Sequence, residues 1–213
     1  MTTTWLILVR HAQTASNGAD PDPRMSGWTD LPLSPAGQRQ GELLHRRFAF
    51  EPMADALYSS PLQRAQDTAA KLLHASRSPM CLLENLREIH CGEVDGLPIS
   101  TVQKRYECFW KENLRQDNEH FRWPGGESYR ELRERSVTAM EKIAALHAGQ
   151  RVLVVTHAGV ISQLVGALNS LNPARWEPFR PQNTSLTELE WGPNTRRIIS
   201  FNDHSHLGLD AHL

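Results

Sequence analysis

The sequence has few cysteines and no long apolar run. Three of its 213 residues are cysteines (Cys81, Cys91 and Cys108), and no two of them form a CxxC pair. An odd number of separated cysteines indicates reduced thiols rather than a disulfide framework. No apolar stretch approaches the ~18 residues of a membrane span, and Trp5–Val9 is too short for a secretion signal. We therefore expect a cytoplasmic protein with no membrane partner.

An excess of one charge sign is also missing, since 23 basic residues stand against 24 acidic ones. The formal charge of −1 gives nucleic acid binding no bulk electrostatic support, so we expect no nucleic acid partner. There is no internal repeat or low-complexity tract. A chain of this length can bury a sizeable core without disulfides or metals, and we expect a single domain over residues 1–213. The oligomeric state stays open, a homodimer included.

Short apolar runs alternate with helical patterns along the chain. Leu6–Val9 and Val152–Val155 are continuously apolar, which is typical of central strands covered by helices on both faces. The expected strands are Trp5–Val9, Asp55–Ser59, Met80–Leu83, Arg151–Thr156, Ser185–Glu190 and Arg197–Phe201. The expected helices are Gln38–Phe48, one opened by Ser60 and Pro61 and running through Leu73, Glu127–Leu146 and Gly159–Leu168. This alternation predicts an α/β fold, a three-layer sandwich with a mostly parallel central sheet flanked by helices.

The segment Leu97–Pro124 breaks the alternation. We expect a helical, lid-like insertion over one end of the sheet. Its aromatic side chains either contribute to that lid or simply pack against the body of the protein, and the sequence favours neither. These aromatic residues are Tyr106, Phe109, Trp110, Phe121 and Trp123.

Three of the predicted strands end in residues that suit an anion. The stretch "LILVRHAQTASN" delivers Arg10 and His11, "ALYSSPLQRAQDTA" delivers Arg64, and "VLVVTHAGV" delivers His157. Ligands of open α/β sheets bind at the carboxyl ends of the strands, so these four side chains should meet. Arginine presents a planar charged fork that matches phosphate oxygens. The pattern predicts a phosphate site.

The surroundings of this site should supply further groups. Helix N-termini after the strands add N–H donors, and Asn17 and the "MSGWTDLPLS" loop add more, with Gly27 allowing close backbone approach. A histidine among such cations has a lowered pKa, so it can be neutral and nucleophilic. Taken singly, each of these residues has an ordinary structural explanation, but their convergence favours a chemical site.

Two other kinds of site have weaker support. The stretches "HCGEVD" and "NDHSHL" have a metal-like composition, but neither has HExxH or CxxC spacing. A cysteine phosphatase needs a thiolate at the head of a glycine-rich loop that ends in arginine, and none of the three cysteines has one. We expect no metal and no cofactor.

The ordered motifs resemble the histidine phosphatase superfamily over nearly the whole chain. "LVRHAQTASN" is similar to the RHG signature of that family, with Ala12 in place of the usual glycine. Further stretches that match it are "DLPLSPAGQRQ", "LYSSPLQRAQDTA", "LREIHCGEVDG", "PGGES" and "VLVVTHAGVI". The resemblance implies a phosphoglycerate mutase-like fold and a metal-independent enzyme acting on a small-molecule phosphate ester.

The resemblance also implies a role for each site residue. His11 is the nucleophile that takes the phosphoryl group, and Glu88 is the general acid and base. Three cationic or imidazole side chains surround the phosphate, and three further residues are secondary contacts. The first set is Arg10, Arg64 and His157, and the second is Asn17, Ser26 and Gly27.

Hydrolysis is favoured over mutase chemistry within the family. Mutases carry a longer insertion after the acid motif, whereas only Leu97–Pro124 separates "VDG" from "GGES" here, and a short lid admits water. The acid motif also looks more like that of the small phosphatases, such as α-ribazole and broad-specificity phosphatases. A mutase-type phosphotransferase and a non-catalytic phosphate-binding protein of the same fold stay as alternatives. The aromatic insertion favours a leaving group with an apolar or heteroaromatic part.

Overall fold

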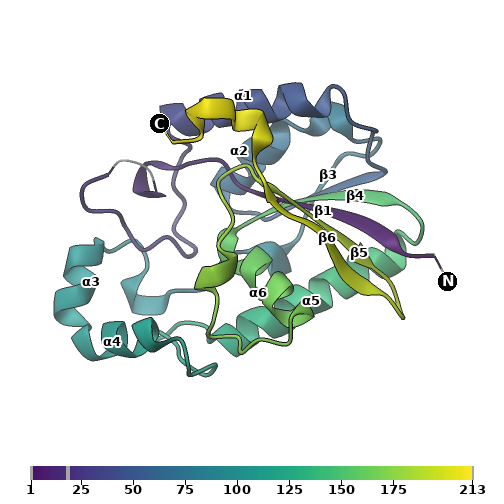
Figure 1. The fold of residues 1–213 in the computed structure, drawn as a ribbon. Helices are drawn as coiled ribbons and strands as arrows, with labels where there is room; N and C mark the ends of the chain where they lie inside the picture. The colour runs from purple at the N-terminus through teal and green to yellow at the C-terminus, as the bar shows by residue number, and fades with distance from the viewer. Residues whose placement is uncertain (1, 18–19, 213) are drawn as a thin grey trace.

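A six-stranded sheet forms the centre of the computed structural model, which describes residues 2–17 and 20–212 (Figure 1). The strand order is β3-β2-β4-β1-β5-β6. The first four strands are parallel to one another, while β5 runs antiparallel to β1 and to β6. The strands are β1 (Thr4–Arg10), β2 (Ala56–Ser59), β3 (Met80–Leu82), β4 (Arg151–Thr156), β5 (Leu186–Trp191) and β6 (Arg196–Asp203). The mostly parallel sheet is confirmed, and each predicted strand end lies within two residues of the observed one.

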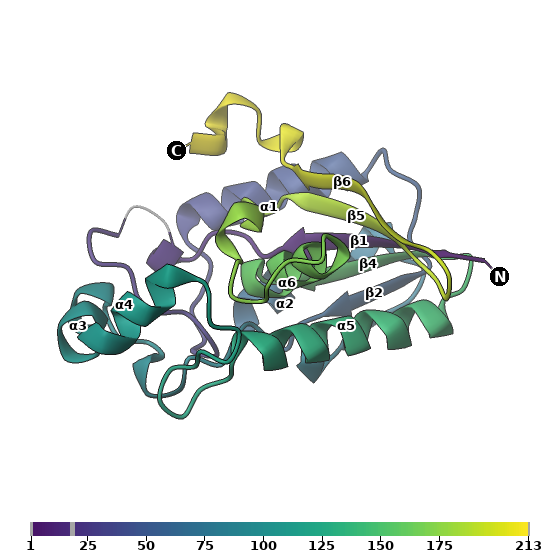
Figure 2. The ribbon, with the colours of Figure 1, turned by 60° about the horizontal axis from the view of Figure 1, so that its bottom comes forward.

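Helices cover both faces of the sheet, which confirms the three-layer sandwich (Figures 1 and 2). The helices α1 (Pro35–Phe48) and α2 (Gln63–Ala70) pack on one face, and α5 (Tyr129–Leu146) and α6 (Ala158–Leu168) on the other. In β1, Leu6 and Leu8 face α5 and α6, while Ile7 and Val9 face α1 and α2. Each such buried side chain stabilises the fold by about 1.5–3 kcal/mol, which explains why Leu6–Val9 is apolar throughout.

Local capping explains where two of the helices begin. Ser34 accepts a hydrogen bond from the N–H of Gly37 at 3.0 Å, and Pro35 occupies the first position of α1. In α5 the side chain of Ser128 accepts from the N–H of Glu131, whose carboxylate in turn accepts from the N–H of Ser128, a capping box. Both helices start within three residues of the predicted positions.

The predicted helix after β2 is present, but Ser60 and Pro61 do not open it and it does not extend to Leu73. Helix α2 begins at Gln63 and ends at Ala70. The N–H of Ser60 donates to the carbonyl of Val155 at 2.9 Å, which continues the pairing of β2 with β4 past the end of the strand. The hydroxyl of Ser60 is held by His157 instead of capping the helix. This long-range pairing overrides the local capping signal.

The predicted insertion consists of two helices, α3 (Ile99–Arg105) and α4 (Glu107–Arg115). Figures 1 and 2 both place them beyond the carboxyl ends of the parallel strands, away from the N-terminus. A third apolar cluster lies beneath them, in which Phe121 and Trp123 are buried and Trp110 is half-buried. Several of the aromatic side chains therefore pack against the body of the protein, which is one of the two interpretations that the sequence allowed.

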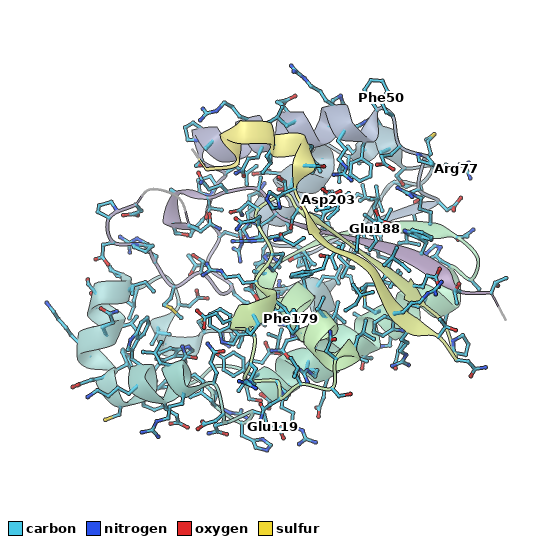
Figure 3. All side chains as sticks on the ribbon, viewed as in Figure 1. Phe50, Arg77, Glu119, Phe179, Glu188 and Asp203 are labelled. Carbon is cyan, nitrogen blue, oxygen red and sulfur yellow. The ribbon has the colours of Figure 1, made fainter. Side chains whose placement is uncertain are left out.

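Short 3₁₀ turns connect several of these elements, at Ala15–Asn17, Leu73–Ala75, Glu84–Leu86, Gly92–Val94, Glu177–Phe179 and Ser205–His212. Figure 3 shows side chains filling the space between the sheet and the helices, while Phe50 projects outward just after α1. In the described part of the chain, no helix has both the length and the apolar character needed to cross a membrane.

Candidate active site

The ends of β1, β2 and β4 bring the predicted residues to one edge of the sheet. Arg10 pairs with Thr156 at the last position of the β1–β4 ladder. Beyond it, the N–H of His11 donates to the carbonyl of Thr156 at 2.9 Å. His157 follows directly after Thr156. The register between two parallel strands thus places His11 beside His157, with ring centres 5.1 Å apart.

A cavity of about 560 Å³ opens at this edge, a volume that suits a small molecule. Five of the eight predicted site residues line it, namely Arg10, His11, Asn17, Ser26 and Glu88. The other three, Gly27, Arg64 and His157, are buried beside these residues.

The imidazole of His11 is held in one tautomer. Its Nδ1 lies 2.8 Å from the carbonyl oxygen of Ala12, which can only accept, so Nδ1 carries the proton and Nε2 has a free lone pair. Burial lowers the pKa of His11 well below its usual value of 6.5, and the neighbouring Arg64 and Arg10 lower it further. A neutral imidazole with an unprotonated Nε2 is the form that attacks phosphorus.

Two buried arginines near His11 have no carboxylate partner among the described residues. Arg10 donates to the carbonyl of Pro181 at 2.6 Å, and Arg64 donates to the carbonyl of Gly27 at 2.7 Å. Neither forms an ion pair, and the Nε of each is buried without a hydrogen bond. Burial and Arg180 lower the pKa of Arg10 to about 10, and burial lowers that of Arg64. Since an unpaired buried charge is costly, this arrangement suits a bound anion.

His157 completes the cluster from the N-terminus of α6. Its Nε2 lies 2.8 Å from the hydroxyl of Ser60, while its Nδ1 is buried without a partner. Burial lowers the pKa of His157 well below 6.5, as does the charge of Arg64. When the Ser60 hydroxyl donates to Nε2, the proton of the neutral ring lies on Nδ1, which leaves an N–H free for an acceptor.

Glu88 enters the cavity from the loop after the third strand. One carboxylate oxygen accepts the N–H of Gly159 at 3.0 Å, in the first turn of α6, and the other accepts the N–H of Ile89 at 2.9 Å. A Cβ at position 159 would lie 2.0 Å from Oε1 of Glu88, so a side chain there would displace the Glu88 carboxylate from its present position. Gly159 is a functional position that the sequence interpretation missed.

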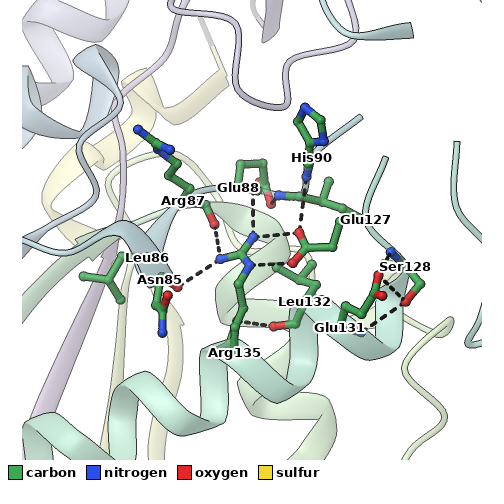
Figure 4. Close-up of polar contacts among 12 residues, drawn as sticks. Asn85, Leu86, Arg87, Glu88, His90, Glu127, Ser128, Glu131, Leu132 and Arg135 are labelled. Carbon is green, nitrogen blue, oxygen red and sulfur yellow. Dashed lines mark hydrogen bonds and ion pairs between the residues drawn. The ribbon is translucent and has the colours of Figure 1, made fainter. Parts of the chain in front are cut away.

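Arg135 fixes the loop that carries Glu88 (Figure 4). Its guanidinium donates to the backbone carbonyls of Asn85, Arg87 and Glu88 at 2.7–2.9 Å. It also pairs with both carboxylate oxygens of Glu127, at 2.6 and 2.9 Å. The motif "PGGES" contains Glu127 but indicated only the entry to the long helix, and no local signal pointed to Arg135. Because three carbonyls depend on one side chain, Arg135 sets the position of the loop.

The loop of residues 26–29 positions Arg64. Asp95 accepts the N–H groups of Gly27, Trp28 and Thr29 at 2.9, 2.6 and 3.1 Å. The carbonyls of Gly27 and Thr29 in turn accept from Arg64. A Cβ on Gly27 would lie 2.5 Å from the carbonyl oxygen of Ile89, so glycine lets this loop pack closely against the backbone of residue 89. The close approach to a ligand stays a prediction. Gly27 acts through Arg64 rather than on the cavity itself.

Asn17 and Ser26 lie on the cavity wall near the loop after β1. The Oδ1 of Asn17 accepts the N–H of Thr14 at 2.8 Å, and the hydroxyl of Ser26 lies 2.7 Å from that of Ser16. Ala12, where the family usually has glycine, donates its N–H to Thr68 and does not lie in the left-handed region of φ. Alanine therefore leaves the backbone path of Arg10 and His11 intact.

The stretches with metal-like composition have other contacts. In "HCGEVD", the ring of His90 packs on Trp28 with centroids 4.4 Å apart, and burial raises the pKa of the Cys91 thiol. In "NDHSHL", His204 bonds the carbonyl of Asn202, and His206 bonds Thr184. Within residues 2–17 and 20–212, no three potential ligands are grouped for a metal ion. That the protein needs no metal stays a prediction.

We expect the free energy of unfolding to fall on mild acidification. His11 and His157 are neutral in the folded chain and take up a proton on unfolding below about pH 6.5. The unfolded state then binds more protons, so stability drops as the pH falls, by up to about 1.4 kcal/mol per pH unit for each histidine. Urea unfolding from pH 7.5 to 5.5 in phosphate-free buffer measures this slope. His157→Asn should make it shallower, and an unchanged slope would show that His157 is not buried in its neutral form.

The chain is similar to known proteins over nearly its whole length. "Metal-independent phosphoserine phosphatase" of Arabidopsis thaliana is 31% identical over 216 residues, which cover 96% of this chain and 83% of that relative. "Phosphoglycerate mutase-like protein 4" of the same plant is 33% identical over 209 residues, which cover 95% of this chain and 86% of the relative. The solved structure of Bacillus stearothermophilus YhfR has a TM-score of 0.85 and 30% identity, and the match covers 96% of this chain and 99% of that one.

Residues 6–204 match the family model described as "Histidine phosphatase superfamily (branch 1)". The match spans nearly the whole chain and includes both strand-end histidines and the loop that carries Glu88. The resemblance inferred from the motifs is thereby confirmed, together with the α/β fold that it implied. The chain belongs to branch 1 of the histidine phosphatase superfamily.

Proposed function

We propose that the protein hydrolyses a small-molecule phosphate monoester through a phosphohistidine on Nε2 of His11. The observation that carries this proposal is the pair of buried arginines without carboxylate partners beside a neutral histidine. The free lone pair of that histidine is on Nε2, because Nδ1 donates to the carbonyl of Ala12. A dianionic phosphate balances the two charges and lies in reach of the nucleophile.

Phosphoryl transfer proceeds in two steps at this site. In the first, a bond forms between phosphorus and Nε2 of His11, the bond to the ester oxygen breaks, and Glu88 gives its proton to the leaving alcohol. In the second, Glu88 takes a proton from water, whose oxygen attacks phosphorus and frees His11. Arg10, Arg64 and the Nδ1–H of His157 stabilise the phosphoryl oxygens. Asn17 and Ser26 are secondary contacts to the substrate.

A mutase-type phosphotransferase is the second candidate, since one of the relatives is named as mutase-like. The insertion favours hydrolysis, because it consists of only two short helices. Arg24 and Arg180, which line the cavity, are both exposed. Water can therefore reach a phosphohistidine formed inside. The neutral His11 with a free lone pair on Nε2 favours catalysis over a non-catalytic binding protein.

The proposal includes a single domain over residues 1–213, in which the segment Leu97–Pro124 acts as a lid, and a cytoplasmic location. Support for the single domain comes from the third apolar cluster, which joins Val102 of the insertion to Tyr129 of α5 and Ala174 of the body. Because these side chains share one core, the insertion belongs to the same folding unit.

Rapid-quench labelling with a ³²P-labelled monoester tests the function. We expect an acid-labile, base-stable phosphoenzyme, with the label on the peptide that contains His11, at neutral pH without added metal. Adding 3-phosphoglycerate as acceptor separates the two candidates, because a mutase passes the label to it and a phosphatase releases inorganic phosphate. No label and no turnover over a broad panel of esters would contradict both enzymatic functions.

A further inference from the structure

We infer that the substrate is the phosphate ester of an uncharged alcohol that carries an aromatic group. This inference rests on the proposed function and specifies the leaving group. Apart from the residues around His11, the cavity wall is largely aromatic and aliphatic. The residues that form this apolar wall are Met25, Ile99, Trp110, Trp123, Tyr129, Leu132 and Trp176.

Three segments far apart in the sequence build the apolar wall. Met25 comes from the loop before α1, Trp110 from α4, and Trp176 from the loop before the 3₁₀ turn Glu177–Phe179. The ring centres of Trp110 and Trp123 lie 6.5 Å apart at an interplanar angle of 39°. Two rings tilted in this way can pack against a third aromatic ring, either face to face with an offset or edge to face.

Several polar groups on this wall are already bonded to one another. The hydroxyl of Tyr129 donates to Asn113 and accepts from the indole N–H of Trp176 at 3.0 Å. The buried side-chain amide of Gln163 accepts from Arg133 at 2.9 Å and donates to the carbonyl of Pro173 at 2.7 Å. A carboxylate or ammonium group placed here would lose its hydration without gaining these partners.

Cys91 adds to the apolar character of the wall. Its side chain is buried, and burial raises the pKa of the thiol well above its usual value, so the thiol is neutral. A neutral buried cysteine packs as a small apolar group. This part of the cavity therefore favours an apolar substrate group over a charged one.

Hydrogen bonds hold the wall in place around the cavity. The loop before α1 and the insertion are joined by backbone bonds, from Met25 to the carbonyl of Leu97 at 2.9 Å and from Ile99 to that of Pro23 at 2.8 Å. The hydroxyl of Ser100 also donates to Asp22 at 2.7 Å. Because the wall is formed in advance, an apolar group enters it at little ordering cost.

Arg24 and Arg180 are the features of the cavity that suit a carboxylate instead. Both are exposed to water at the cavity rim. One guanidinium nitrogen of Arg24 donates to the carbonyl of Gly96 at 2.9 Å. Attraction between exposed charges is weak and is screened by salt. The apolar wall should therefore outweigh these two arginines in selecting the leaving group.

A panel of alkyl esters with similarly basic leaving groups tests the inference. The substrates are 2-phenylethyl phosphate, n-propyl phosphate, O-phosphoserine and 3-phosphoglycerate. We expect kcat/KM for 2-phenylethyl phosphate to exceed that for n-propyl phosphate by about 10- to 100-fold, as burial of one aromatic ring allows. Neither carboxylate ester should exceed n-propyl phosphate. Aryl esters are left out because their better leaving groups would raise the rate on their own.

A matched pair of variants on α4 ties the preference to the wall. Trp110→Ala should lower the ratio between the phenylethyl and propyl esters by about 10-fold. Leu114→Ala, an exposed position on the same helix that does not line the cavity, should keep the ratio. A higher kcat/KM for O-phosphoserine or 3-phosphoglycerate, or equal values for all esters, would overturn the inference and leave the proposed function standing. No phosphoenzyme from any ester would overturn both.

Discussion

Replacement of His11 by alanine is expected to lower kcat by at least about 10⁴-fold, the scale on which a covalent nucleophile contributes. The arginines and Glu88 stay in place, so the substrate should still bind, but the neutral imidazole with a free lone pair on Nε2 is lost. The phosphoenzyme should disappear from rapid-quench samples at the same time.

Phosphate binding separates this expectation from a simple loss of structure. His11→Ala should bind inorganic phosphate by calorimetry about as well as the unchanged protein, because Arg10 and Arg64 keep their carbonyl partners. His120→Ala removes an exposed histidine that does not line the cavity and is the matched control. If His11→Ala bound phosphate normally and still turned over substrate within 10-fold of the control, the nucleophile would have to be another residue.

The pattern of apolar residues predicted the helices and strands well wherever it depends on which side chains are buried. The alternation of Leu6, Ile7, Leu8 and Val9 between two helical layers is a direct consequence of the two-residue period of a strand. The start of α2 could not be predicted in the same way. Ser60 carries a capping signal, yet its N–H pairs with Val155, 95 positions later in the chain, and such a contact leaves no local trace.

The site residues that could be predicted from the sequence are those that lie at the end of a strand or directly after it. Arg10, His11 and His157 follow from the rule that ligands bind at the carboxyl ends of parallel strands. The residues that hold them could not be predicted, because their partners are distant in sequence. Gly159 meets Glu88 from 71 positions away, and Arg135 meets the loop of Glu88 from 47. Helix propensity does not single out Arg135, because many other residues would suit this position of α5 equally well. Only its contacts with the loop of Glu88 distinguish Arg135 from its neighbours.

The aromatic insertion allowed two interpretations, and the structure contains both. Phe121 and Trp123 are buried in the third apolar cluster, as packing residues are. Trp123 and Trp110 also line the cavity. A large side chain can be core on one face and cavity wall on another, and composition alone does not separate the two.

The Glu88→Gln change should affect esters according to their leaving groups. The amide keeps the size of the side chain but has no proton to give to the leaving oxygen. For an alkyl ester, kcat/KM should fall by about 10²- to 10⁴-fold, the usual contribution of a general acid. For p-nitrophenyl phosphate it should fall by about 10-fold or less, since that leaving group departs without protonation. With this ester the phosphoenzyme should accumulate, because the base that activates water is also lost.

Arg135→Met provides the contrast that separates an acid from a structural effect. Arg135 touches Glu88 through its backbone carbonyl and fixes the loop, but it has no part in proton transfer. Loosening the loop misplaces Glu88 for both proton transfers and loosens the cavity wall, so the two esters should lose activity more evenly than in Glu88→Gln. Equal losses for both esters in Glu88→Gln would mean that the side chain acts by holding Gly159 and α6 in place. The ratio of the two losses, not their size, therefore decides whether Glu88 is the acid.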